Sequence, residues 1–283
     1  MADDRVLSLE RQGHVAWVWL DRPEARNAMG PAFWSELPAV MAEVGADPDV
    51  RVVVLAARGP HFSVGLDLKA MAGLLTGGPP SGDASGGGGG RASSAARAVA
   101  ARAGVLQMQR SVTAVAECPK PVVAAVHGYC IGGGVDVISA CDIRLASADA
   151  VFSVRETKVA IVADLGSLQR LPRIIGSGHV AELAYTGKDI PAERAAQIGL
   201  VNDVLPDLDA LHKAAQELAE EIAANSPLAV QGTKAVLQAC ADRSVAEGLD
   251  YVATWNAGFL QSDDLVEAMT AFMEKRPPNF RGR

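Results

Sequence analysis

The sequence is poor in cysteine and has no long uninterrupted apolar run, and each shortage excludes a class of protein. The four cysteines form no C-x-x-C pair and no zinc spacing. We therefore expect free thiols in a reducing compartment rather than a disulfide framework. No stretch reaches the ~18 apolar residues of a membrane span, and the polar N-terminal residues lack the apolar region of a signal peptide. The sequence predicts a cytoplasmic protein that does not enter a membrane.

Positive charge is scarce as well. Lysine and arginine together number 26 against 33 aspartates and glutamates, which gives a net charge of −7. This balance disfavours non-specific binding to nucleic acid. The five histidines are scattered along the chain without the spacing of metal ligands. We therefore expect no nucleic-acid partner and no metal.

Apolar residues, in contrast, make up 49% of the 283 residues, which is enough for a full hydrophobic core. The first part of the chain alternates strand-like and helix-like segments: a hairpin at 6–20, an amphipathic helix that begins at Pro31, and a buried strand at 52–56. After residue 206 the pattern changes to helices alone, one of which starts with a capping box of Ser244 and Glu247. We therefore predict an α/β core over residues 1–206 and a C-terminal helical region over residues 207–283.

A low-complexity insert at residues 75–94 interrupts the predicted core. It contains five consecutive glycines at 86–90 and offers too little apolar surface to offset the entropy of ordering it. The alternative, a phosphate-binding loop, would need the lysine and the Ser/Thr of a P-loop, which are missing here. We expect a flexible surface loop whose removal leaves folding and turnover nearly unchanged.

Three consecutive glycines at 132–134 follow a buried strand at 121–126 and precede a helix-like segment. Such a turn lets the backbone approach a ligand and leaves amide N–H groups unpaired, where they can hold a negatively charged oxygen. Asp136, Glu156 and Asp164 follow along the chain. Amide donors near carboxylates predict proton transfer beside a carbonyl group. The alternative is a tight turn followed by three solvated acids.

A second glycine turn lies at Gly65, just before a helix-like run that begins at Leu66. Its backbone offers another candidate donor to an oxyanion, and a simple glycine turn is the alternative.

Other motifs carry less weight. The stretch GSGHVA at 176–181 follows a helix-like segment rather than the strand that a dinucleotide-binding turn requires. His127, beside a buried strand, favours a structural role over that of a base. An aromatic residue recurs every four positions at Tyr251, Trp255 and Phe259, which is typical of a helix face in the core or at a subunit contact.

Longer stretches resemble a known family. FSVGLDLKAM (62–71), PKPVVAAVHGYCIGGGVDVISACDIRLAS (119–147) and MEKR (273–276) resemble the crotonase superfamily, also called the enoyl-CoA hydratase/isomerase family. FSVRETKVAIVADLGSLQRLPRIIG (152–176) and LDYVATWN (249–256) resemble its Δ3,5-Δ2,4-dienoyl-CoA isomerase branch most closely. The resemblance implies a crotonase-like α/β spiral of ββα turns, with a C-terminal helical region through which three subunits associate.

The resemblance also implies the site residues. The backbone amides of Leu66 and Gly133 match the family's oxyanion hole. Asp136 and Glu156 match the two catalytic acids of the hydratases, which have glutamate at both positions, and Asp164 matches a third acid of the isomerase branch. We expect isomerisation of 3,5-dienoyl-CoA to 2,4-dienoyl-CoA in fatty-acid β-oxidation, with Glu156 acting at carbon 2 and Asp164 at carbon 6.

Coenzyme A enters this reaction only as part of the substrate, so the resemblance implies no separate cofactor. It also implies a homotrimer or a homohexamer. The implied contacts of coenzyme A are Ser63, Gly65, Asp67, Leu68, Phe272 and Lys275. The insert departs from the family pattern and lies on the side where the substrate would be covered.

Two other functions stay open. A 2-enoyl-CoA hydratase would use Asp136 and Glu156 around one water molecule, but it has no evident use for Asp164. A non-catalytic or RNA-binding protein with the same fold is the second alternative, which the acidic charge balance and the lack of a lysine-rich helix disfavour.

Overall fold

Buried parallel strands form the centre of the molecule, in a computed structural model that describes residues 5–73 and 93–283. The six-stranded sheet has the order β1-β2-β3-β4-β6-β9. Its strands are β1 (Leu7–Gln12), β2 (Val15–Leu20), β3 (Val52–Ala57), β4 (Val122–Val126), β6 (Ile143–Ser147) and β9 (Asp203–Leu205). Only β1 runs antiparallel to its neighbour. Most of the predicted insert lies outside the described residues.

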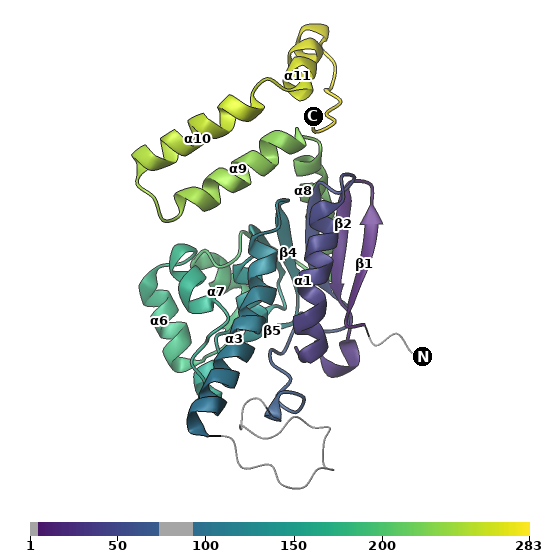
Figure 1. Ribbon diagram of the computed structural model, residues 1–283. Coiled ribbons are helices and arrows are strands. Elements are labelled where there is room, and N and C mark those ends of the chain that lie inside the picture. The colour runs from purple at the N-terminus through teal and green to yellow at the C-terminus, as the bar shows by residue number, and fades with distance from the viewer. Residues whose placement is uncertain (1–4, 74–92) are drawn as a thin grey trace.

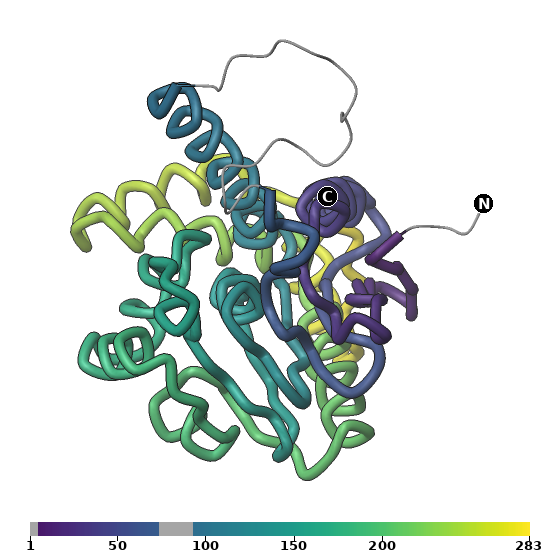
Figure 2. The backbone as a smooth tube through the Cα atoms, turned by 90° about the horizontal axis from the view of Figure 1, so that it is seen from below, coloured from purple at the N-terminus to yellow at the C-terminus, as the bar shows by residue number. Residues whose placement is uncertain are grey.

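Side chains alternate between the two faces of this sheet, as the strand period requires. In β2, Val15, Trp17 and Trp19 pack in one apolar cluster, while the residues between them pack in a second, larger cluster. Helix α8 (Leu208–Ala223) covers the first face. Helices α1 (Pro31–Ala46) and α3 (Ser94–Ala116) lie side by side over the other face (Figures 1 and 2). Both faces are therefore covered, which explains why β2, β3 and β4 are apolar throughout.

A second, three-stranded sheet has the order β5-β7-β8. Its strands are β5 (Tyr129–Ile131), β7 (Val151–Ser153) and β8 (Ile190–Pro191). The sequence pattern did not predict this sheet, because strands of three residues or fewer are too short to show an alternation.

The remaining helices connect the strands and then form the C-terminal part. They are η1 (Pro23–Ala25), α4 (Gly133–Ser139), η2 (Glu156–Val159), α5 (Ser167–Arg170), η3 (Leu171–Arg173), α6 (Ser177–Thr186), α7 (Ala192–Gln197), α9 (Pro227–Cys240), α10 (Val245–Phe259) and α11 (Asp263–Glu274). The capping box predicted at the start of α10 is present, since Ser244 and Glu247 satisfy each other's backbone amides.

The C-terminal helices α9 to α11 project beyond the sheet, at the top of Figure 1. The aromatic stripe of α10 is turned partly onto α9, because Trp255 lies against Gly232, where a Cβ atom would come within 2.4 Å of the indole nitrogen. Helix α11 instead leaves apolar side chains open, with Phe272 and Met273 85% and 73% exposed. Helices follow one another after residue 206, but α8 packs on the sheet, so the proposed domain boundary stays a prediction.

Candidate active site

The two glycine turns meet because they follow neighbouring parallel strands. The carboxyl ends of β3 and β4 lie at the same edge of the sheet, where ligand sites of α/β proteins form. The backbone of the first turn then pairs with that of the second. The Ser63 amide donates to the Tyr129 carbonyl at 2.8 Å, and the Ile131 amide donates to the Ser63 carbonyl at 3.0 Å.

Glycine is required at the point of closest approach. Gly65 has a φ of +87°, and a Cβ atom there would lie 2.8 Å from the Ile131 carbonyl oxygen and 3.6 Å from the Gly133 nitrogen. Among the hydrogen bonds of the described residues, neither the Leu66 amide nor the Gly133 amide donates to a protein acceptor. Two free N–H donors thus lie on adjacent backbone segments, the arrangement that an oxyanion needs.

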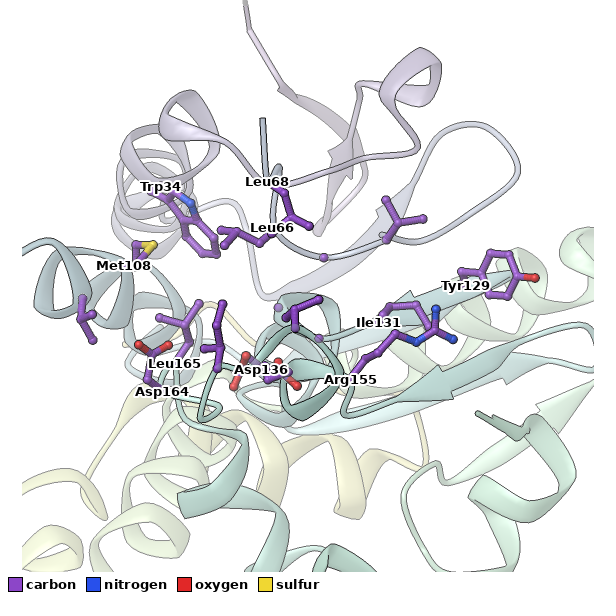
Figure 3. A pocket seen from close by; sticks show the side chains of 18 of the residues that line it. Trp34, Leu66, Leu68, Met108, Tyr129, Ile131, Asp136, Arg155, Asp164 and Leu165 are labelled. Atoms are coloured by element: carbon purple, nitrogen blue, oxygen red, sulfur yellow. The ribbon is translucent and has the colours of Figure 1, made fainter. Parts of the chain in front are cut away.

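A cavity of about 640 Å³ opens in front of these amides, lined by Leu66 and Gly133 together with all three candidate acids. In Figure 3, Trp34, Leu66 and Leu68 form one wall, and Asp136, Arg155 and Asp164 come from the opposite wall. Met108 and Leu165 lie at the Asp164 end, whereas Tyr129 lies at the other end, beyond Arg155. The cavity therefore has an apolar end and a polar end, with the acids towards the apolar one.

Asp136 is 1% exposed, and Oδ1 of its carboxylate accepts the Ser167 amide at 2.6 Å. Burial raises the pKa of this carboxyl to about 6, against the effect of the Ser167 hydrogen bonds and with a smaller contribution from the charge of Asp164. The hydrogen bond fixes Asp136 to the start of α5.

Glu156 has a higher pKa than Asp136. Burial, followed by repulsion from Asp136, raises the pKa to about 7. Among the described residues, its buried Oε2 atom has no hydrogen-bond partner. Burial also raises the pKa of Asp164. All three carboxyls therefore bind their protons more tightly than exposed carboxyls do, which suits groups that exchange protons with a substrate near neutral pH.

The residues expected to contact coenzyme A are spread more widely. Gly65 and Leu68 line the cavity. Ser63 is fully buried behind the turn, where its hydroxyl donates to the Asn27 carbonyl and accepts the Gly65 amide. Asp67 is paired with Arg22 at 2.9 Å. Phe272 is on α11 and Lys275 is its C-cap, and neither lines the cavity of the same chain.

Sequence reasoning missed several residues that line the cavity: Arg26, Trp34, Met108, Tyr129, Arg155 and Asp189. Arg155 and Asp189 form an ion pair. Arg155 directly precedes Glu156, so its position next to a candidate acid could have indicated that it lies at the site. The other residues come from segments far apart in the chain and carry no local signal. Among the described residues, His, Cys, Asp and Glu side chains do not gather in the number a metal site needs, and the absence of a metal stays a prediction.

The buried Glu156 carboxylate should cost stability at alkaline pH, and Glu156→Gln should remove that cost. The folded protein binds this proton more tightly than the unfolded chain, because the pKa rises from 4.5 to about 7 on folding. Stability is therefore lost as pH rises through this interval, by about 3 kcal/mol when complete. We expect Glu156→Gln to melt at a higher temperature than the wild type at pH 8 and at the same temperature near pH 4.5. The exposed Glu43→Gln is the control, and an equal shift at both pH values would contradict the expectation.

The chain belongs to the enoyl-CoA hydratase/isomerase family, whose model matches residues 10–77 and 74–283. Within it, the chain is similar to proteins named Δ3,5-Δ2,4-dienoyl-CoA isomerase. It is 45% identical to the peroxisomal protein of Arabidopsis thaliana over 92% of this chain and 90% of that protein. It is 44% identical to the mitochondrial protein of Homo sapiens over 94% of this chain and 78% of that protein.

Solved structures agree on the fold. A structure of enoyl-CoA hydratase from Bacillus anthracis matches with a TM-score of 0.86 and 31% identity, covering 99% of this chain and all of the other. The resemblance to the crotonase superfamily and the predicted crotonase-like fold are thereby confirmed.

The predicted cytoplasmic location is wrong in the light of these relatives. Their names place them in the peroxisome or the mitochondrion. This contradicts an expectation that rested on the cysteine pattern, the lack of a long apolar run and the polar N-terminal residues. No helix in the described part of the chain is both long and apolar enough to cross a membrane.

Proposed function

We propose that the protein isomerises 3,5-dienoyl-CoA to 2,4-dienoyl-CoA in the β-oxidation of unsaturated fatty acids. The observation that carries this proposal is the third acid, Asp164, which lines the same cavity as Asp136 and Glu156. Moving both double bonds by one carbon requires proton removal at carbon 2 and proton return at carbon 6, four carbons away. Two separated carboxyls suit that task. The relatives named dienoyl-CoA isomerase, at 44–45% identity, support the same reaction.

The reaction begins at carbon 2, whose proton is a weak acid until the thioester oxygen is stabilised. The free amides of Leu66 and Gly133 donate to that oxygen as negative charge develops, and each donor contributes about 3–4 kcal/mol. Glu156, with its pKa raised to about 7, is a stronger base than an exposed glutamate and removes the proton. The electron pair of the C–H bond forms the dienolate.

The dienolate carries its charge from the oxygen to carbons 2, 4 and 6. Protonated Asp164 gives its proton to carbon 6, the double bonds settle between carbons 2 and 5, and the thioester carbonyl forms again. Asp164 is left ionised and Glu156 protonated, so Glu156 releases its proton to solvent and Asp164 takes one up from solvent before the next turnover. Asp136 holds the Ser167 amide and raises the pKa of Glu156 by its charge.

The polar end of the cavity suits the coenzyme A part of the substrate. Arg26 and Arg155 offer positive charge for phosphate groups, and Tyr129 lies at the same end. The ion pair between Arg155 and Asp189 means that a phosphate competes with a carboxylate for this arginine. The acyl chain then extends past the acids towards Met108 and Leu165.

A trimer or hexamer would cover the apolar surface of α11 and give Phe272 and Lys275 a role. Neither residue lines the cavity of its own chain, so their contact with coenzyme A requires a neighbouring subunit. We expect light scattering at micromolar concentration to give a mass three or six times that of the chain. A monomeric mass would contradict this arrangement.

The proposed reaction is tested by incubating the purified protein with 3,5-dienoyl-CoA and, separately, with 2-enoyl-CoA. The expected result is appearance of the 2,4-diene absorbance with the first substrate and slow or no loss of the enoyl absorbance with the second. The hydratase alternative draws support from Asp136 and Glu156 and from the (E)-benzylidenesuccinyl-CoA hydratase of Thauera aromatica, 35% identical over 98% of this chain. Rapid hydration of 2-enoyl-CoA, with no conversion of 3,5-dienoyl-CoA to 2,4-dienoyl-CoA, would establish that alternative.

A further inference from the structure

The segment that carries Asp164 has little backbone support of its own. It connects η2 to α5 without regular structure. In the part of the chain that the structure describes, none of the amides from residues 162 to 165 donates to a backbone carbonyl. A carboxyl that must reach one particular carbon needs a fixed backbone beneath it. The contacts that fix this segment must therefore come from side chains.

Gln109 supplies one such contact from helix α3, 55 residues earlier in the chain. Its Nε2 atom donates to the backbone carbonyl of Asp164 at 2.6 Å. The preceding residue, Met108, lines the cavity. Helix α3 is itself fixed to α1, because the buried Ser111 hydroxyl donates to the Trp34 carbonyl at 2.5 Å. Gln109 thus ties the acid to a helix that also forms the cavity wall.

A second contact comes from the same face of α3, one turn later. Arg170 donates from Nη2 to the Thr113 hydroxyl at 3.3 Å and from Nη1 to the Leu165 carbonyl at 3.2 Å. Its guanidinium lies directly over Gly166, where a Cβ atom would come within 1.8 Å of Nη1. The Asp164 carbonyl is therefore bound directly by Gln109 of α3, and the Leu165 carbonyl is linked to α3 through Arg170.

We propose that Gln109 is a positioning residue that sets the distance between Asp164 and carbon 6 of the substrate. The inference rests on the proposed isomerase function and deepens it. Gln109 holds only the backbone of Asp164, while Glu156 and the amides of Leu66 and Gly133 are held by other elements. Loss of the Gln109 hydrogen bond affects proton return at carbon 6 and leaves proton removal at carbon 2 intact.

The measurable consequence is the fate of the dienolate. In the wild type the dienolate is protonated at carbon 6 to give product or at carbon 2 to give back substrate. When Asp164 is displaced, a larger share of the dienolate is protonated at carbon 2. The ratio of isomerisation to deuterium exchange at carbon 2 therefore falls, which a general loss of folding or of substrate binding would not produce.

The test compares Gln109→Met and Gln109→Ala with Gln107→Ala in deuterated buffer. Methionine keeps the length of the side chain but cannot donate, and Gln107 is an exposed glutamine on the same helix. We expect both Gln109 variants to lose about tenfold in kcat for isomerisation, a loss in the range that misplaced catalytic groups show. Carbon-2 exchange and KM should stay within about twofold of the wild type, and Gln107→Ala should match the wild type throughout.

Two results would overturn the proposal while leaving the isomerase function intact. In the first, the Gln109 variants keep the wild-type rates of isomerisation and of carbon-2 exchange, so their ratio is unchanged. In the second, both rates fall equally in Gln109→Met while its melting temperature is unchanged. If the wild type exchanges the carbon-2 proton but forms no 2,4-dienoyl-CoA, the proposed function itself fails and the role of Gln109 fails with it. The diene absorbance of the wild type distinguishes these cases before any variant is compared.

Discussion

Asp164→Asn is expected to lower the rate of isomerisation by roughly 10²–10⁴-fold, the usual contribution of a general acid. Asparagine has nearly the same shape as aspartate, and the Gln109 hydrogen bond goes to the backbone of this residue, so the substitution preserves the packing. The amide cannot give a proton to carbon 6. Deuterium exchange at carbon 2 should survive, because Glu156 and the free amides of Leu66 and Gly133 remain in place.

The measurement is the absorbance of the 2,4-dienoyl-CoA product together with deuterium incorporation at carbon 2, recorded on the same sample. Asp209→Asn, an exposed aspartate on α8, serves as the matched control and should behave as the wild type does. Isomerisation that persists in Asp164→Asn would show that another group protonates carbon 6. The role assigned to Asp164 would then be wrong.

Glu156→Gln is expected to remove both activities, with a loss of roughly 10³-fold or more, because no other group is assigned to the carbon-2 proton. The wild-type rate at limiting substrate should rise with pH as this carboxyl ionises, around its pKa of about 7, and should fall at higher pH as Asp164 loses the proton that it donates. The variant should keep the fold and should be more stable than the wild type at pH 8.

The pH–rate profile and the residual exchange rate check this prediction. If Glu156→Gln retains carbon-2 exchange while Asp136→Asn loses it, the base is Asp136 and the two roles are exchanged. If neither substitution affects exchange, then a group other than Glu156 and Asp136 removes the proton.

Local patterns indicated much of the main sheet and most helices. The strand at 52–56, the helix that begins at Pro31 and the capping box of Ser244 all depend on neighbours within a few residues, and the structure contains each of them. The short strand Tyr129–Ile131 could not be predicted in this way. Its three residues acquire their conformation by pairing with β7 and with the turn at Ser63.

At the site, too, local features could be predicted from the sequence and contacts between distant segments could not. Glycines at 65 and 132–134 are visible in the sequence because positive φ and close backbone approach leave few alternatives. The three acids follow the second glycine turn in the sequence, and the family resemblance supplied their separate roles. Contacts between distant segments left no signal, since any glutamine can donate to a carbonyl and nothing in the sequence around Gln109 indicates Asp164. The pairing of Asp67, a predicted coenzyme A contact, with Arg22 left no signal in the sequence for the same reason.

The most direct test of the two-acid account follows the hydrogen that leaves carbon 2. A 3,5-dienoyl-CoA carrying two deuterium atoms at carbon 2 is converted in ordinary water, and the product is examined by NMR. Transfer by two separate carboxyls predicts one deuterium left at carbon 2 and only hydrogen from solvent added at carbon 6, because Glu156 keeps the deuterium that it removes. Deuterium at carbon 6 would show that a single group carries the proton along the chain, and would contradict the roles assigned to Glu156 and Asp164.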